Sequence, residues 1–332
     1  MDRYSQSLDL QIDLARRLKR DRWVRNYTDY VAKDVAIGPV SDRLAHGLEE
    51  GHTYFITDEM IDLIQWAATS MPSHGLEAEH LPTPYGWAWL ERPVVQNDGR
   101  GEPLTVRALS WQQVADQHGR QGILFAQWAD HEEVSDREKE LLGAALGEVR
   151  PKIGRIHLVH LATWRYGHDW LSDERLKELK EHVDERSEGT DGDESDASGM
   201  GPLTYDATLE AHTHSLGFAT AMWAIMGQDL GRPEPVMPPK PARKRATRAG
   251  RKETNINIVH MRRNMGGDAE EGEGKRADGT RRVKVRYWVK PFWRRQWYPK
   301  QQVHRLILIP PHERGPADAP LKTKPTIRVV DR

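Results

Sequence analysis

The chain has 332 residues, with 49 Lys and Arg against 50 Asp and Glu. It contains no cysteine, which excludes a disulfide framework and a thiolate metal site and suits a cytoplasmic protein. The longest apolar run, at 216–226, is shorter than the roughly 20 residues that a membrane-spanning helix needs. We therefore predict a soluble protein with no membrane partner.

The formal net charge of −1 hides a strong separation of charge along the chain. Residues 240–332 hold 25 Lys and Arg against 9 Asp and Glu, whereas residues 1–239 hold 24 against 41. A basic segment attracts polyanions and an acidic one repels them, so contact with a nucleic acid should be confined to the C-terminal part. The alternative is that the two halves neutralise each other within one chain or in a homo-oligomer.

Residues 1–186 predict an acidic α+β domain. Apolar positions among the first forty residues indicate a helix, and HTYFIT at 52–57 is a short β-type run that leads into a helix capped by Thr57 or Asp58. Turn residues at 96–103 indicate a hairpin. Further β-type segments follow at 86–94, 104–111, 121–129 and 155–164, the last predicted to be central because it has few polar residues. The sheet should be mixed and largely antiparallel.

The remaining chain divides by composition into four segments. The acidic, Gly- and Ser-rich stretch at 187–203 predicts a disordered linker, because it cannot bury enough apolar area to order itself. Residues 204–230 predict a long buried helix that is apolar nearly all round in its last turns. Residues 231–253 are Pro-rich and basic and predict a linker, and residues 254–332 predict a small basic β unit.

The stretch at 281–305 combines three Trp and two Tyr with nine Lys or Arg. Side chains alternate across a strand, so Val283, Val285, Tyr287 and Val289 should pack on a core. The other face is then a basic row that contains an indole, which suits phosphates and a stacked base. A turn after this strand would present further basic and aromatic side chains outward. The predicted nucleic-acid-binding residues are Lys284, Arg286, Trp288, Lys290, Trp293, Arg294, Arg295, Trp297, Tyr298 and Arg305.

Two other interpretations of this region stay open. His304, Tyr298 and Arg295 are residue types that a metal-independent nuclease or toxin-like enzyme uses to move protons and to stabilise a phosphorane. Their spacing does not establish that they converge. Basic side chains on a wet strand face are also common, and they suit a protein-interaction module whose partner is acidic, such as a second copy of the N-terminal body.

The sequence offers no pattern for a cofactor or a metal. It contains no Walker motif, no GxGxxG after a strand and no HExxH. His157 and His160 are three residues apart on a predicted strand, which places them on opposite faces and excludes shared ligation. We predict neither a cofactor nor a metal site.

The C-terminal pattern YWVKPFWRRQWYP…VHRLILIPPHERGPADAPL resembles the ending of a family of uncharacterised actinobacterial and actinophage proteins. That family ends in a Trp-Val-x-Gly-His-Trp-Arg-x-Gln-Trp-Tyr-Pro type motif, followed by His-Arg and a Gly-Pro…Pro-Leu tail. INIVHMRR and TYFITDEMIDLI…LPTPYGWAWL are similar too, so the resemblance covers much of the chain. Phe292 stands where the family pattern places His, which argues against an enzyme if that His is catalytic. The resemblance implies a phage or mobile-element setting and no mechanism.

Together these features predict an α+β protein in which a small basic β unit follows a long buried helix. We predict that this unit binds DNA or RNA and that the protein is a binding protein rather than an enzyme.

Overall fold

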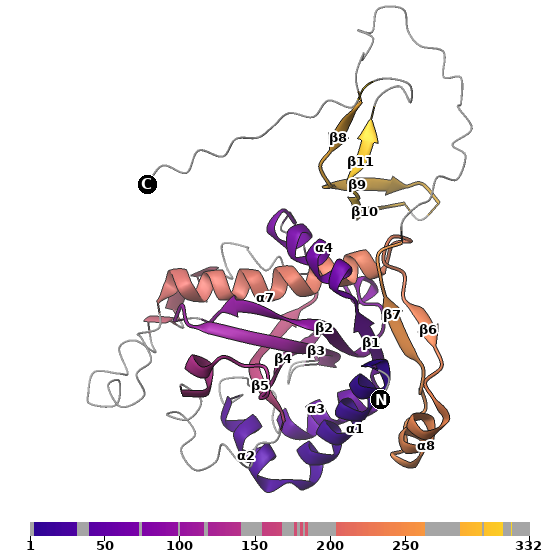
Figure 1. Ribbon diagram of the computed structural model, residues 1–332. Helices are drawn as coiled ribbons and strands as arrows, with labels where there is room; N and C mark the ends of the chain where they lie inside the picture. The colour runs from indigo at the N-terminus through magenta and orange to yellow at the C-terminus, as the bar shows by residue number, and fades with distance from the viewer. Residues whose placement is uncertain are drawn as a thin grey trace, which may run out of the picture. The chain divides into compact units, whose positions relative to one another are not determined.

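Figure 1 shows the computed structural model of the chain. It describes residues 3–31, 40–72, 75–98, 100–115, 119–140, 155–167, 176–177, 180–181, 183–184, 204–262, 286–300, 302–314 and 320. The chain forms two compact units, which we call unit 1 (Met1–Met261) and unit 2 (Arg262–Arg332).

Unit 1 contains both helices and strands. In chain order these are α1 (Arg3–Arg20), α2 (Arg22–Val31), α3 (Val40–Glu50), β1 (His52–Ile56), α4 (Asp58–Thr69), the 3-10 helix η1 (Ala78–His80), β2 (Tyr85–Asn97), β3 (Pro103–Ala115), β4 (Gln121–Asp130), β5 (Ile156–Arg165), α7 (Tyr205–Met226), β6 (Glu234–Val236), α8 (Lys240–Arg248) and β7 (Ile256–Val259).

The strands of unit 1 form one seven-stranded sheet in the order β5-β4-β3-β2-β1-β7-β6 (Figure 1). Strands β2 to β5 pair in sequence and antiparallel, and β6 pairs antiparallel with β7. Strand β1 lies parallel to both of its neighbours, β2 and β7. The prediction of an α+β protein with a mixed, largely antiparallel sheet is confirmed.

Helices cover both faces of this sheet: α1, α2 and α3 lie on one side, and α4 and α7 on the other (Figure 1). The core on the α1 side is aromatic, with Trp87, Trp89 and Trp128 buried. Trp87 and Trp89 are two residues apart on β2 and therefore face the same way. The Trp128 indole donates a hydrogen bond to Ser110 Oγ at 2.9 Å, which satisfies its polar atom inside the core.

The long helix predicted at 204–230 is α7, and it packs against α4 and the sheet as part of unit 1. It begins after Thr204, whose hydroxyl accepts a hydrogen bond from the Ala207 backbone at 3.3 Å. Near its end, Trp223 packs edge-on against Trp111 and Phe125, with ring centroids 5.7 and 6.0 Å apart. No helix in the part of the chain that the structure describes is long and apolar enough to cross a membrane.

Strand β5 is an edge strand, so the prediction of a central strand is wrong. It is apolar because α2 covers it: the Tyr27 hydroxyl donates to the Leu158 carbonyl at 2.7 Å. An irregularity opposite Gln127 shifts the register by one residue, so that His157 pairs with Ala129 and His160 with Gln127. The two histidines therefore share a face, and the expectation of opposite faces is wrong because a bulge resets the alternation.

The segment 231–253 is not a linker. It contains β6 and α8, and β7 follows at the centre of the β1-β7-β6 part of the sheet. The boundary between the units therefore lies at 261/262 rather than at 253/254. The sequence did not predict this helix because its buried side consists of only two small residues, Ala242 and Ala246, which give no clear apolar pattern. A basic helix of this kind stays folded because one narrow face packs on α1.

Arg251 fastens the end of this segment to unit 1. Its guanidinium donates to the carbonyls of Leu48 and Gly51, at 2.7 and 2.5 Å, where α3 ends. Gln11 on α1 donates to the same two carbonyls at 2.8 and 3.0 Å and accepts a hydrogen bond from Thr53. Burial lowers the pKa of Arg251 to about 10. Its position is therefore structural.

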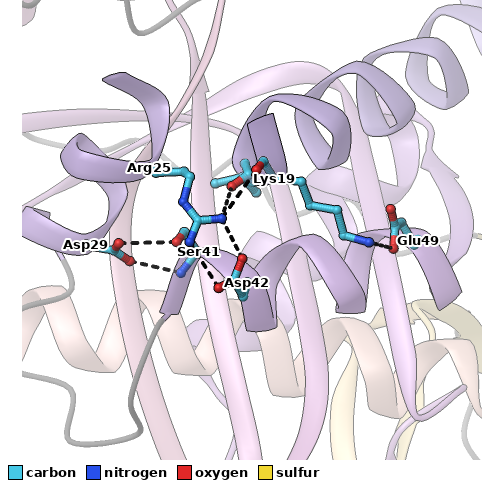
Figure 2. A network of polar contacts seen from close by, with 7 residues as sticks. Lys19, Arg25, Asp29, Ser41, Asp42 and Glu49 are labelled. Atoms are coloured by element: carbon cyan, nitrogen blue, oxygen red, sulfur yellow. Dashed lines mark hydrogen bonds and ion pairs between the residues drawn. The ribbon is translucent and has the colours of Figure 1, made fainter. Parts of the chain in front are cut away.

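Polar contacts also join α1, α2 and α3 at the surface, as Figure 2 shows. Arg25 binds Asp42 through both terminal nitrogens, at 2.6 and 3.0 Å. The hydrogen bond from Arg25 lowers the pKa of Asp42. Asp29 accepts hydrogen bonds from the backbone and hydroxyl of Ser41 at 3.0 and 3.2 Å. Each carboxylate here is occupied by a donor within the fold, so this cluster orders helices and offers no ligand site.

Unit 2 contains two small antiparallel sheets, one formed by β9 and β10 and one by β8 and β11. The strands are β8 (Tyr287–Val289), β9 (Phe292–Tyr298), β10 (Val303–Ile309) and β11 (His312–Arg314). The predicted disordered stretch at 187–203 and residues 263–285, including Lys284, lie outside the described residues.

Candidate nucleic-acid interface

The aromatic and basic residues of unit 2 lie mainly on the β9–β10 hairpin. Antiparallel pairing sets Trp297 opposite His304, Arg295 opposite Leu306 and Trp293 opposite Leu308. Residues directly opposite each other share a face, and neighbours along a strand alternate. The hairpin therefore has two faces, which we call the Trp face and the Tyr face.

The Trp face holds Trp293, Arg295 and Trp297 from β9 and His304 from β10. The exposure of its side chains increases along the hairpin: Leu308, opposite Trp293, is buried, whereas Trp297 is 44% exposed. The rings of Trp297 and His304 lie 4.8 Å apart at an angle of 48°. The exposed end of this face thus presents two neighbouring rings, with the exposed Arg295 two residues along the strand.

The Tyr face holds Arg294 and Tyr298 from β9 and Arg305 from β10. The Arg305 guanidinium lies 5.7 Å from the centroid of the Tyr298 ring, within cation–π range. Arg294 and Arg305 are exposed. Phe292, at the start of β9 on the same face, is 43% exposed.

Arg294 and Arg295 lie inside strand β9, so the prediction that a turn presents them is wrong. The turn follows Tyr298 instead, where Pro299 cannot donate a ladder hydrogen bond. As neighbours in a strand, the two arginines point to opposite faces. A single strand of nucleic acid lying flat on one face therefore meets one of them, not both.

The β8–β11 sheet is less basic than the sequence suggests. Arg286 forms an ion pair with Glu313 at 3.0 Å, and Glu313 pairs across the ladder with Trp288. The predicted basic row is thus partly neutralised at its centre. The side chain of Trp288 lies outside the described part, so its predicted stacking role stays a prediction. Lys290, in the link to β9, is exposed.

The stretch from Arg286 to Arg314 is strongly basic overall. It holds seven Lys and Arg and a single acidic residue, Glu313. Within the described ranges, Lys290, Arg294, Arg295 and Arg305 form no ion pair with another side chain, which leaves their charges available to a phosphate. Sequence reasoning missed two members of this surface, Phe292 and Lys300. For Lys300, the sequence did contain a signal: the Pro299-Lys300 step after the aromatic run indicates an exposed turn.

The alternative catalytic set does not converge. His304 and Arg295 belong to the Trp face, whereas Tyr298 belongs to the Tyr face. A general acid and a general base must both reach one phosphate within hydrogen-bond distance. The hairpin separates these two candidate proton-transfer groups by its own thickness, so the geometry disfavours a nuclease that uses this set.

Among the described residues, no group of three or more His, Cys, Asp and Glu side chains is arranged to hold a metal ion. No protein-family model, curated protein or solved structure matches the chain.

Proposed function

We propose that unit 2 binds single-stranded DNA or RNA on the β9–β10 hairpin, with bases stacking on the Trp face and a phosphate contacting Arg295 on that face. The observation that carries this proposal is the Trp297–His304 ring pair, 4.8 Å apart on an open strand face. An indole that is 44% exposed leaves apolar surface in water, and a stacked base would cover it.

The charge and the exposed rings of the hairpin support the same assignment. The exposed side chains of the hairpin are arginines and single rings, which suit phosphates and stacked bases. Stacking accepts any base, so the proposed binding has little sequence preference. Each arginine that contacts a phosphate should add about 0.7–0.9 unit to the dependence of log Kobs on log salt.

The resemblance to actinobacterial and actinophage proteins supports a phage or mobile-element setting in the cytoplasm. A basic surface with exposed rings suits a single-stranded nucleic acid of such an element. The acidic unit 1, with 31 Lys and Arg against 42 Asp and Glu, would repel nucleic acid over most of its surface and so direct it to unit 2.

Equilibrium binding of the full chain to labelled oligonucleotides tests the proposal. Trp297→Ala should weaken single-strand binding by about 1–3 kcal/mol and leave the fold intact. Trp23→Ala is the matched control, since Trp23 in α2 is 43% exposed, almost as much as Trp297. Equal effects of the two variants, or no binding by the unaltered chain at low salt, would overturn the proposal.

The same titrations separate binding from catalysis. Arg295→Gln, on the Trp face, should lower the salt slope, and Arg294→Gln, on the opposite face, should change it much less. His304→Ala should reduce affinity only through lost stacking. Oligonucleotide length is checked by gel after each titration. Cleavage in the presence of a metal chelator that disappears in His304→Ala would contradict a pure binding role.

A further inference from the structure

A second cationic surface lies in unit 1, on the helix that the sequence presents as a linker. Lys240, Lys244 and Arg248 are four residues apart along α8. Residues at this spacing lie on one side of a helix, about 6 Å apart along its axis. All three side chains are exposed. We call these three residues the α8 stripe.

The other side of α8 is firmly held. Ala242 and Ala246 are buried where α8 packs on α1. Arg245 forms a two-point ion pair with Asp9, at 2.6 and 2.8 Å, and the buried guanidinium of Arg251 fixes the chain just beyond the helix. The stripe is therefore displayed on a rigid element rather than on a flexible arm.

Repulsion within the stripe acts against the stability of α8, although Arg248 in the last turn is favoured by the helix dipole. Like charges four residues apart repel, and a Lys at the first helical position opposes the helix dipole. The first turn of α8 contains no acidic residue that would offset this. Within the described residues, no stripe side chain forms an ion pair, in contrast to Arg245. A partner with a row of anionic groups would relieve the repulsion.

The chemistry of α8 favours phosphates over an acidic protein. The helix, KPARKRATR, has no large apolar side chain, and protein interfaces depend on apolar or aromatic residues at their centre. Phosphate contacts need only positive charge and hydrogen-bond donors. The stripe spans about 12 Å, a length over which a nucleic-acid strand presents several phosphates.

We propose that the α8 stripe binds the phosphate backbone of the nucleic acid, as a contact site distinct from the hairpin of unit 2. This inference rests on the proposed function, because it takes the ligand of unit 2 as its own. The stripe adds affinity without sequence preference, since phosphate contacts carry no base information.

The test compares four full-length proteins in a salt series with single-stranded DNA, RNA and duplex DNA. They are the unaltered chain, the stripe variant (Lys240→Gln, Lys244→Gln, Arg248→Gln), a hairpin variant (Arg294→Gln, Arg295→Gln, Arg305→Gln) and the combination. The stripe variant should lower the salt slope by about 2–3 units if all three contacts are lost. Its thermal midpoint should not fall, because the change removes repulsion.

A charge-matched control sets the background. Arg16→Gln, Lys177→Gln and Arg232→Gln together remove three positive charges from unit 1, each from an exposed ion pair. If this control lowers the slope as much as the stripe variant does, the stripe has no specific role.

The outcomes distinguish this inference from the function of unit 2. A hairpin variant that loses binding beside a stripe variant that keeps the full slope would overturn the stripe and leave the hairpin in place. Binding of polyglutamate that matches nucleic acid at equal charge, and that depends on the stripe, would show that the occupant is an acidic polypeptide. Loss of slope in both single variants, additive in the combination, is the result that the proposal expects.

Discussion

Arg251→Met removes the guanidinium that joins the end of the basic segment to unit 1. In the native protein this group donates to the Leu48 and Gly51 carbonyls at the end of α3. It also lies 3.4 Å from the Thr53 hydroxyl. Methionine keeps much of the side-chain length and apolar stem, so the substitution tests the hydrogen bonds more than the packing.

The expected cost can be worked from these contacts. Hydrogen bonds from a charged group contribute about 1.5–3 kcal/mol each, or about 3–6 kcal/mol for the two short ones. These values already include the desolvation of the guanidinium, which also lowers the pKa of Arg251 to about 10. Gln11 still donates to both carbonyls in the variant, so neither is left unsatisfied. We expect a loss of about 3 kcal/mol in the free energy of unfolding, at the lower end of this range because both carbonyls keep a donor.

Urea unfolding followed by tryptophan fluorescence measures this change, with an unaltered m-value as the sign that the native state stays compact. Lys252→Met is the control, because Lys252 is the next residue and forms only an exposed ion pair with Glu50. It should cost less than about 0.5 kcal/mol. Equal, near-zero effects of the two variants would mean that the segment is detached from unit 1, and the placement of α8 would be refuted.

Two further variants test the core. Burial lowers the pKa of His157 to about 4, so the unfolded state takes up a proton first and stability should fall by about 3 kcal/mol as pH drops from 6.5 to 4. His157→Leu should remove that share of the pH dependence in urea titrations, and an unchanged difference between pH 7 and pH 4 would contradict the burial. Gly86→Ala would bring a methyl group closer than van der Waals contact to the Trp111 indole and should cost about 1–3 kcal/mol in thermal unfolding. Gly217→Ala in α7, where the new methyl group would make only ordinary contacts, should not destabilise.

Local patterns predicted the elements whose backbone hydrogen bonds are made within one segment or between adjacent segments. The hairpin of β2 and β3 follows from turn residues between two β-type runs, and α7 follows from its apolar turns. The sequence also showed that the C-terminal part is rich in basic and aromatic residues. These features depend on residues within about twenty positions of one another, which is where periodicity and turn chemistry act.

The remaining features depend on partners far along the chain. Nothing near Arg251 indicates that it meets carbonyls about two hundred positions earlier, or that Ala246 packs on α1. The bulge that aligns His157 with His160 is likewise set by β4 rather than by β5 alone. In unit 2, the pairing register of β9 and β10 places Tyr298 and His304 on opposite faces of the hairpin. The sequence does not give this register, so it could not show whether the alternative catalytic residues converge.

Ultraviolet crosslinking tests the central claim most directly. The full chain is irradiated with a single-stranded oligonucleotide that carries 5-iodouracil, and the crosslinked peptides are mapped by mass spectrometry. We predict adducts concentrated in 286–314, with Trp297 the main site, because its exposed ring can stack on the modified base. Trp297→Phe should keep an adduct and Trp297→Ala should lose it. Adducts confined to unit 1, or spread evenly over exposed aromatic residues such as Trp23, would contradict a nucleic-acid interface on the β9–β10 hairpin.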